Sequence, residues 1–439
     1  MYALRGKPLP EKDATSSQEK KNPTVPEDIG AEIGLFVTQI DAVADTLPLA
    51  AIAIQEVSSR SSQQLATFLH EECKIVFQDG TKKSYSLEPG QQIKFQRFMR
   101  RVHKADLAKE LVPRGLLVAI VSQFDACVGG LIRQLFKLRP ELLETSDRNL
   151  TYSQLLEFGS IDAAREYVIE KEIESVLRES HTDQFIWLEK KFVLPLRKEL
   201  PAWPLFIEVM ERRNLFVHTN GYVSRQYLEV CRKHGCKIPG DVCAGMPLSL
   251  TREYFAAASE CLWEIGVKLG QVLWRKVQPS EIDVADVNLN EMALSLITEG
   301  RYQLARVLLD FATETLKTHT TANSRLSLVM NRAQAYKWAG DEESCKRILD
   351  AEDWTATNLK FRLAHAILRD DFKEANRIVA QIGKNDRELS RHAYREWPIF
   401  RVFRKSPEFI ALFEQIFEEP FNKFIVDTET GSSNPQKVN

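Results

Sequence analysis

The 439-residue chain is poor in the features that mark several protein classes. It holds only 19 glycines and 18 prolines, and 44% of its residues are hydrophobic. This composition is that of globular domains rather than of a low-complexity or fibrous protein. The net charge is −2, which excludes a polycation that coats nucleic acid along its whole surface. Any contact with RNA or DNA therefore needs a local basic patch.

Disulfides and membrane spans are not expected either. Seven cysteines, an odd number, argue against a disulfide framework and for a reducing compartment. The N-terminal residues lack the apolar stretch of a secretory signal. The most apolar run, 116–136, is interrupted by Gln123, Asp125 and Arg133, whereas a spanning helix needs about 20 mostly apolar residues. We expect this run to be a helix buried in a protein core, and the protein to be cytoplasmic, without membrane association.

Signature motifs of several enzyme classes are also missing. The sequence has no G-x4-GK[ST] loop, no G-x-G-x-x-G and no H-E-x-x-H, nor acidic residues at the spacing of metal-dependent nucleases. Cys231-x2-His234-x-Cys236-x6-Cys243 offers ligands of the zinc type, but the spacing is not that of a zinc finger, knuckle or ribbon. We favour packed cysteines there, and expect neither a metal nor another cofactor.

Hydrophobic spacing along the chain predicts an all-α protein of two or three domains. Asp79-Gly80 is a tight-turn signal between short strand-like stretches, so a small β-hairpin is expected in an otherwise helical N-terminal region. No other segment demands a sheet. The expected regions are a disordered arm (1–28), the N-terminal region (29–107), a helical bundle (108–275), a linker (276–290), helical repeats (291–426) and a disordered tail (427–439).

The expected repeats share a turn pattern. A turn begins at Gly300, Gly340 and Asp370, and a small residue stands five positions further on each time, where a second helix would pack against the first. The spacings of 40 and 30 residues bracket the 34-residue tetratricopeptide (TPR) repeat, and the segment resembles a degenerate TPR array. An irregular stack of helical hairpins is the alternative. A protein partner of these repeats is expected.

The stretch ERRNLFVHTNG, residues 211–221, concentrates groups that bind and transfer charge. Arg213, Asn214 and His218 fall within six positions at the expected end of a helix, which Asn220-Gly221 terminates with residues that accept the left-handed conformation. An arginine and a histidine at this spacing are weak evidence alone, because a charged helix face with a capping histidine has the same pattern. The surrounding run of long amphipathic helices raises its value.

With that context, residues 108 to about 275 resemble a HEPN domain, the family of higher eukaryote and prokaryote nucleotide-binding helical domains. RNLFVHTNGYV matches the family's R-N-x3-H followed by a glycine turn. The resemblance implies a bundle of four to five helices. In the ribonuclease members it also implies metal-independent RNA cleavage by a dimer, with Arg213, Asn214 and His218 as the catalytic residues. Some members are inactive and serve as interaction modules.

The residue types suit this chemistry. Cleavage by the 2′-OH without a metal needs a base, an acid and a cation beside the phosphorane. Histidine titrates in the right range, and arginine offers a planar fork of donors to phosphate. At 100° per residue, however, Arg213 and His218 lie about 140° apart around a regular helix. Either the helix end is distorted, or two copies of the motif complete one site in a homodimer, as the resemblance implies.

Additional basic residues are candidates for RNA binding. Arg212 fits a six-position spacing to His218, but no polar residue follows it immediately. KFQRFMRRVHK, residues 94–104, surrounds an apolar helix face with basic side chains, which predicts either an ordinary solvated helix or an RNA-guiding stripe. The candidate RNA contacts are Arg212, Lys94, Arg97, Arg101 and Lys104.

Two functions follow as hypotheses. The first is a HEPN-type endoribonuclease whose N-terminal region and repeats control access or recruit a partner. Such domain combinations resemble bacterial toxins and phage-defence nucleases that stay silent until triggered. The alternative is a non-catalytic dimeric protein whose TPR-like repeats bind a partner.

Overall fold

The computed structural model describes residues 26–79, 81–143, 150–386 and 388–422, which form two compact units, 26–279 and 280–422. The described residues are mostly helical, with a single pair of short strands among them, so the all-α prediction is confirmed. The predicted disordered arm and tail fall almost entirely outside the described residues.

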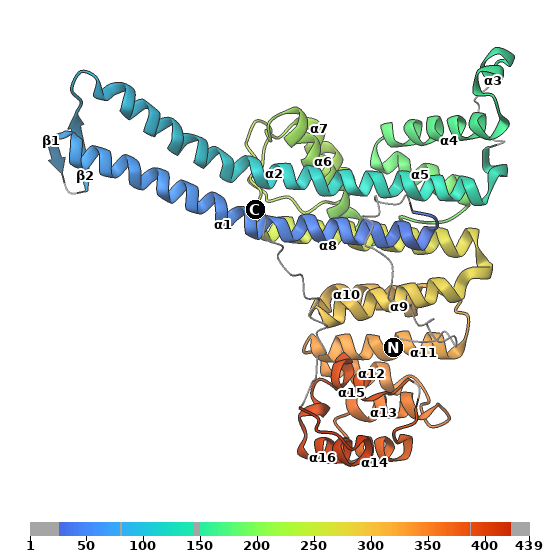
Figure 1. Ribbon diagram of the computed structural model, residues 1–439. Coiled ribbons are helices and arrows are strands. Elements are labelled where there is room, and N and C mark those ends of the chain that lie inside the picture. The colour runs from blue at the N-terminus through green and yellow to red at the C-terminus, as the bar shows by residue number, and fades with distance from the viewer. Residues whose placement is uncertain (1–25, 80, 144–149, 387, 423–439) are drawn as a thin grey trace, which may run out of the picture. The chain divides into compact units, whose positions relative to one another are not determined.

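Three long helices form the centre of the first unit (Figure 1). They are α1 (Ile29–Glu72), α2 (Gln91–Leu138) and α8 (Arg252–Val277), and each packs against the other two. Two glycines of α8 permit the close approach of α1. A Cβ atom at Gly270 would lie 2.6 Å from Cγ1 of Ile33, and one at Gly266 would overlap the ring of Phe36.

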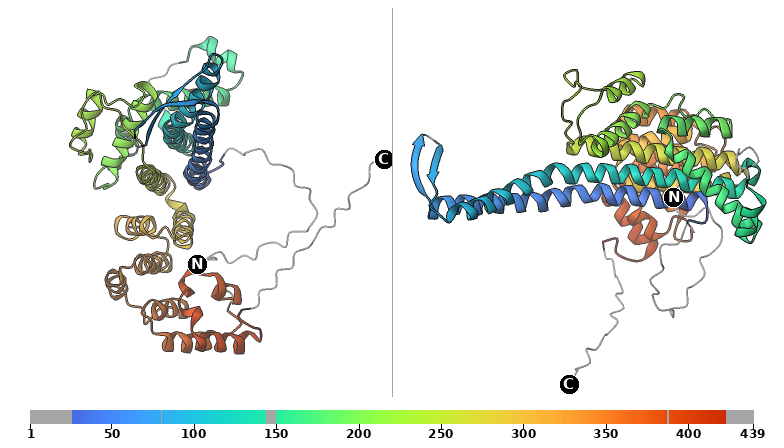
Figure 2. Two further views of the ribbon diagram at one scale, coloured as in Figure 1. Left: turned by 90° about the vertical axis from the view of Figure 1, so that its left-hand side faces the viewer. Right: turned by 90° about the horizontal axis from the view of Figure 1, so that it is seen from above.

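Beyond the bundle, α1 and α2 continue as an antiparallel two-helix arm, which ends in the hairpin of β1 (Lys74–Asp79) and β2 (Lys82–Ser86) (Figure 2). This confirms the predicted hairpin. Residues spaced alternately by three and four positions line the seam between the helices, as in a coiled coil. The buried and half-buried seam residues include Leu47, Ile54, Ser58, Ser61, Leu65 and Phe68 of α1, and Phe95, Phe98, Val102 and Ala105 of α2.

Shorter helices cover the bundle. α4 (Ile161–Arg178) and α6 (Trp203–His218) pack on α2, while α5 (His181–Phe192) lies against both α4 and α6. α7 (Arg225–Lys233) packs on α6, and the short α3 (Tyr152–Phe158) on α4. Their starts are set by local sequence, since Ser160, Ser180 and Ser224 each accept a hydrogen bond from a first-turn amide.

The apolar run 116–136 lies within α2 and is buried through Leu117, Phe124 and Leu131, as expected of a core helix. By length and apolar composition alone, α1 and α2 both reach the threshold of a membrane span. About half of the apolar window of α2 is buried in the bundle, but only 17% of that of α1. Core helices of soluble proteins pass the same test, so this is weak evidence for a membrane.

Two predicted boundaries differ from the structure. The boundary at 107/108 falls inside α2, which runs unbroken from the arm into the bundle. Pro113 stands near that point, and it interrupts the helical pattern in the sequence without ending the helix. The predicted linker 276–290 holds the end of α8, a short 3₁₀ turn at Pro279–Glu281 and the first half of α9 (Ile282–Thr298).

The second unit begins with three helical hairpins. α9 pairs with α10 (Tyr302–Asp310), α11 (Ala322–Trp338) with α12 (Glu342–Asp350), and α13 (Leu359–Leu368) with α14 (Phe372–Ile382). The predicted turns fall between the helices of each pair. Gly300, Gly340 and Asp370 all have positive φ, and the small residues five positions on, Ala305, Cys345 and Ala375, are buried.

The same hydrogen bond closes each of these turns. The amides of Arg301, Asp341 and Asp371 donate to the carbonyls five residues earlier, at 2.8, 3.0 and 2.9 Å. This is the long bond of a Schellman motif, in which the left-handed residue lets the chain reverse. Beyond the hairpins, α15 (Arg391–Glu396) and α16 (Pro407–Phe417) close the unit with an aromatic cluster of Tyr394, Phe400, Phe403, Phe409 and Phe413.

Candidate functional site

The motif of residues 211–221 lies at the C-terminal end of α6, which remains a regular α-helix through His218. The amides of Thr219 and Gly221 both donate to the carbonyl of Leu215, at 2.9 Å. Asn220 and Gly221 have φ angles of +51° and +81°, as predicted for the end of this helix. The distorted helix end considered as one alternative is therefore not observed.

Arg114 of α2 holds the turn that follows the motif. Its buried guanidinium donates to the carbonyl of Asn220 at 3.1 Å and to that of Leu248 at 3.3 Å, and pairs with Glu110. The same group lies over the ring of Phe216. A Cβ atom at Gly221 would approach the guanidinium to 3.1 Å, so a glycine is needed here for space as well as for its φ angle.

Arg213 belongs to a half-buried polar cluster built from three helices. Its Nη2 donates to Oδ2 of Asp125 at 3.1 Å, and Oδ1 of Asp125 lies 2.7 Å from Nε2 of His181. The side chains of Arg213, Asp125 and His181 are 21%, 30% and 10% exposed. Because the carboxylate accepts both bonds, Asp125 fixes the guanidinium and the imidazole relative to each other.

Asn214 and Glu211 extend this cluster along α6. Asn214 Nδ2 lies 3.5 Å from Oε1 of Glu211. Burial raises the pKa of Glu211, and the hydrogen bond from Asn214 and the charges of His181 and Arg213 oppose that rise without cancelling it. The cluster thus joins a cation, two carboxyl groups and a histidine, which are the groups that bind anions and transfer protons.

Arg212, one of the predicted RNA contacts, points into the bundle instead. Its Nε donates to Oε1 of Glu208 at 2.7 Å, its Nη1 to the carbonyl of Ser249 at 3.1 Å, and its guanidinium stacks 3.8 Å from the ring centre of Tyr254. Glu208 also accepts hydrogen bonds from the hydroxyls of Tyr227 and Tyr254. A side chain this buried and this well paired is not available to RNA, so this prediction is corrected.

His218 is exposed at the last position of α6. Within the described part of the chain, no side chain bonds to its ring. Since the helix is regular, the directions of Arg213 and His218 differ by about 140° around its axis. The structure brings Arg213, Asn214 and Glu211 together with Asp125 and His181, but it does not bring His218 of the same copy into that cluster.

The cysteine-rich segment does not gather metal ligands. His234 Nδ1 accepts a hydrogen bond from Nε1 of Trp203 at 3.3 Å, and the Cys236 thiol points at the carbonyl of Pro204 at 3.0 Å. Cys231 is buried against α6, whereas Cys243 is exposed. No group of three or more His, Cys, Asp or Glu side chains suited to a metal ion occurs among the residues that the structure describes.

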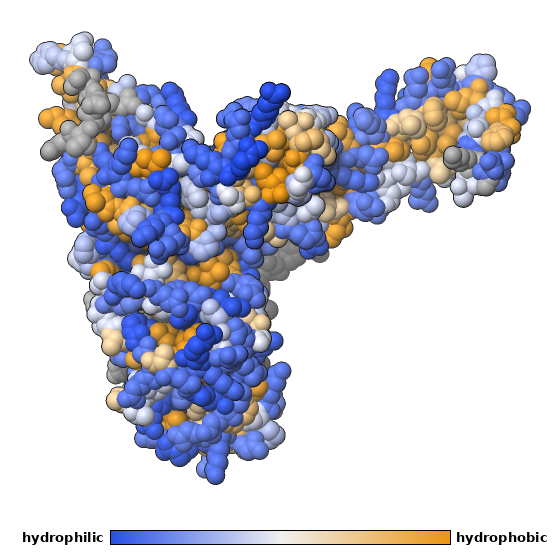
Figure 3. Space-filling view, turned by 180° about the vertical axis from the view of Figure 1, so that it is seen from behind, coloured by the Kyte–Doolittle hydropathy of each residue, from blue (hydrophilic) through white to orange (hydrophobic). Residues whose placement is uncertain are grey.

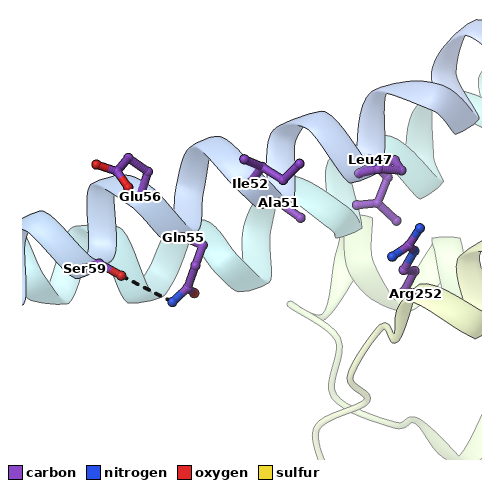
Figure 4. A pocket seen from close by; sticks show the side chains of 8 residues that line it. Leu47, Ala51, Ile52, Gln55, Glu56, Ser59 and Arg252 are labelled. Atoms are coloured by element: carbon purple, nitrogen blue, oxygen red, sulfur yellow. Dashed lines mark hydrogen bonds between the residues drawn. The ribbon is translucent and has the colours of Figure 1, made fainter.

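A separate open groove of about 720 Å³ runs along α1 where the arm leaves the bundle (Figure 4). Its lining is largely aliphatic, with a hydrogen bond of 3.4 Å between Gln55 and Ser59 on one side. Glu56 and Arg252 are its charged residues. It offers no histidine or cysteine, so we do not assign an acid–base reaction to it.

Sequence reasoning missed Asp125, His181 and Arg114. Asp125 was noticed only as a polar interruption of an apolar run. That interruption was the available signal, because a carboxylate on an otherwise buried helix face needs a partner.

Comparisons with family models, with curated proteins and with solved structures find no match to this chain.

Proposed function

We propose that the first unit is a HEPN-type, metal-independent endoribonuclease with Arg213, Asn214 and His218 as its catalytic residues. The observation that carries the proposal is the contrast within one motif. Asp125 holds Arg213 in a fixed, half-buried position, while His218 reaches solvent beside a turn that Arg114 fixes. A preorganised cation and a solvent-exposed imidazole are the two kinds of group that phosphodiester cleavage without a metal requires.

The proposed reaction is transesterification within the RNA strand. A base takes the proton of the 2′-OH, whose oxygen attacks the adjacent phosphorus while the bond from phosphorus to the 5′-oxygen breaks. An acid protonates the departing 5′-oxygen, which leaves a 2′,3′-cyclic phosphate on one product. His218 is assigned to proton transfer, and Arg213 and Asn214 to the phosphate oxygens, where charge accumulates in the transition state.

The proposed active species is a homodimer. The angle of about 140° between Arg213 and His218 on one regular helix keeps one copy from directing both at the same phosphorus. Two α6 helices that meet around a twofold axis would pair each Arg213 with the partner's His218. Asp125 and His181 are then positioning residues, because they act on the direction of Arg213 and not on the substrate.

The second unit is proposed to recruit a partner through its TPR-like hairpins and so to control when cleavage occurs. Stacked hairpins offer an extended surface for a peptide or a folded protein. A toxin or phage-defence effector in the cytoplasm is the setting that fits a general ribonuclease under such control.

The test is incubation of the full-length protein with total RNA in EDTA. Wild-type protein should yield fragments with cyclic phosphate ends, and Arg213→Ala and His218→Ala should yield far fewer. Mixing the two variants should restore part of the activity, since a mixed dimer keeps one complete site. Matched controls are Arg225→Ala and His70→Ala, which remove the same residue types from other exposed positions.

Cleavage that survives His218→Ala, or that needs a divalent ion, would refute the mechanism. The non-catalytic alternative keeps one observation in its favour. Asp125 neutralises Arg213 within a half-buried pair, as it would in a purely structural role. That alternative predicts a dimer that neither cleaves RNA nor changes its properties when His218 is replaced.

A further inference from the structure

A basic stripe runs along the outer face of the arm in α2. It consists of Arg97, Arg100 and Lys104, all exposed. Their spacings of three and four residues place them on one side of the helix, about 4.5 and 6 Å apart along its axis. The sequence holds no acidic residue between Glu88 and Asp106, so this stretch of the arm is uniformly positive.

The stripe is distinguished from its neighbours by its lack of partners. Lys94 pairs with Glu72 at 2.5 Å, and Lys109 pairs with Asp106 at 2.9 Å. Arg101 donates to Gln64 across the seam at 3.4 Å. Among the described residues, none forms a hydrogen bond or an ion pair with the side chains of the basic stripe.

This arrangement costs the arm stability. Like charges three and four residues apart on a helix repel one another, and among the described residues the carboxylates of the arm that form ion pairs do so with other cations instead of the stripe. A two-helix coiled coil has no structural need for the stripe. A bound polyanion would remove the repulsion between these charges. Each phosphate that the stripe neutralises would also release condensed counterions, which favours binding.

The tip of the arm adds exposed flat and apolar surface. Phe77 in β1 is 61% exposed and Ile93 at the start of α2 is 71% exposed, and Tyr85 lies in β2. Figure 3 shows hydrophobic residues among hydrophilic ones along the arm. Aromatic side chains beside a basic track are the combination that binds single-stranded nucleic acid, because bases stack on the rings while cations hold the backbone.

We propose that the arm binds single-stranded RNA, with the basic stripe on the phosphates and Phe77 beneath a base. The choice of RNA as the polyanion rests on the proposed ribonuclease function. Binding at the arm and cleavage at α6 are nonetheless separate properties. The stripe and Asp125 lie on the same continuous helix, so α2 connects the proposed RNA-binding surface to the bundle that carries Arg213.

The experiment measures binding without cleavage. Full-length protein carrying His218→Ala is titrated into a fluorescently labelled single-stranded RNA in EDTA, and fluorescence anisotropy is followed over a range of salt concentrations. The triple variant Arg97→Gln, Arg100→Gln, Lys104→Gln should lower the slope of log affinity against log salt by about 2, since each single-strand phosphate contact contributes about 0.7. Phe77→Ala should weaken binding about fivefold or more without changing that slope.

The matched control removes three paired charges from the same arm. Arg60, Lys74 and Lys109 are ion-paired with Glu56, Glu88 and Asp106. Their triple glutamine variant loses three positive charges, as the stripe variant does, so the two variants have the same net charge. Its salt slope should change by less than half as much. Thermal melting should show that the stripe variant is at least as stable as wild type, because its substitutions remove repulsion.

Equal losses in both triple variants, or none in either, would overturn the proposal. So would polyglutamate that competes as well as RNA at equal charge, because it would assign the stripe to an acidic protein. Wild-type protein that binds RNA through the stripe without cleaving it would support this inference on its own, because cleavage under the proposed control also needs the partner of the second unit. RNA cleavage by the wild type, combined with unchanged RNA binding by the stripe variant, would overturn this inference and leave the ribonuclease standing.

Discussion

Two faces of α6 carry adjacent arginines in opposite situations. Arg212 faces the interior, where a carboxylate that is only 4% exposed, two tyrosines and a backbone carbonyl surround it. Arg213 faces the edge of the bundle, where its partner Asp125 is 30% exposed and shared with a histidine. The two residues have the same charge and adjacent positions, but the side chain of Arg213 is the more exposed, at 21% against 11% for Arg212.

Under the proposed function, Arg212 stabilises the bundle and Arg213 takes part in the reaction. Removing either member of the buried pair leaves a charge with no solvent to stabilise it. Removing a member of the edge pair costs little, because water reaches both groups. The inner face should therefore respond to mutation in stability and the outer face in activity.

The largest effect is expected from Arg212→Ala. Glu208 would remain buried as an unpaired charge, so the free energy of unfolding should fall by about 3–5 kcal/mol, measured by urea unfolding. A double variant, Glu208→Gln with Arg212→Met, should recover much of that loss. If the single variant were as stable as wild type, the inner face would have no special role in support.

On the outer face, Arg213→Ala and His218→Ala should each lower the rate of RNA cleavage by about 100-fold or more. Their unfolding free energies should stay within about 1 kcal/mol of wild type, since both residues lie at the edge. Cleavage kinetics and urea unfolding on the same preparations provide the check. If a variant lost both its activity and its stability, the replaced residue would have a structural role, as Arg212 has.

A smaller effect is expected from Gly221→Ala, compared with Gly340→Ala in the second unit. Both glycines have positive φ, but a Cβ atom at Gly340 meets no atom within 4 Å, whereas one at Gly221 meets Arg114. The strain of a left-handed alanine should cost about 1 kcal/mol at both positions. Overpacking should add about 1 kcal/mol at Gly221 alone, which calorimetry of the two units would detect. Equal effects would show that Arg114 moves aside freely.

The smallest effect concerns pH and Glu211. Burial raises its pKa in the folded state, so the folded state holds the proton more tightly than the unfolded chain does. Its contribution to stability is therefore fully present below the ordinary glutamate pKa and is lost as pH rises through the folded value. Glu211→Gln should stabilise the protein at neutral pH and have no such benefit under acid conditions, as urea unfolding at the two pH values would show. If Glu211→Gln stabilised the protein equally at both pH values, the raised pKa of Glu211 would be excluded as the cause.

Much of the fold follows from local signals in the sequence. The helical pattern of α6, its end at Asn220-Gly221, and the three turns at Gly300, Gly340 and Asp370 depend on spacing and on residues that accept positive φ. These are short-range properties. The hairpin at the tip of the arm follows in the same way from the turn signal at Asp79-Gly80.

The partners within the site do not follow from such signals. Asp125 lies 88 positions before Arg213, and His181 lies 32 positions before it, so their meeting depends on how α2, α5 and α6 pack. The orientation of Arg212 was equally hidden, because burial is decided by which face of α6 meets α8. The arm was missed because the apolar seam of a two-helix coiled coil resembles that of a helix packed in a bundle.

Both helices of the arm contain a proline near its root, Pro48 in α1 and Pro113 in α2. The contact of Ser58 with Asp106 sets the register between the helices, and it puts the two prolines within about one turn of each other. Each ring removes one backbone hydrogen bond from its helix and favours bending there. The root of the arm, where the two prolines lie, is thus the place at which both helices bend most easily.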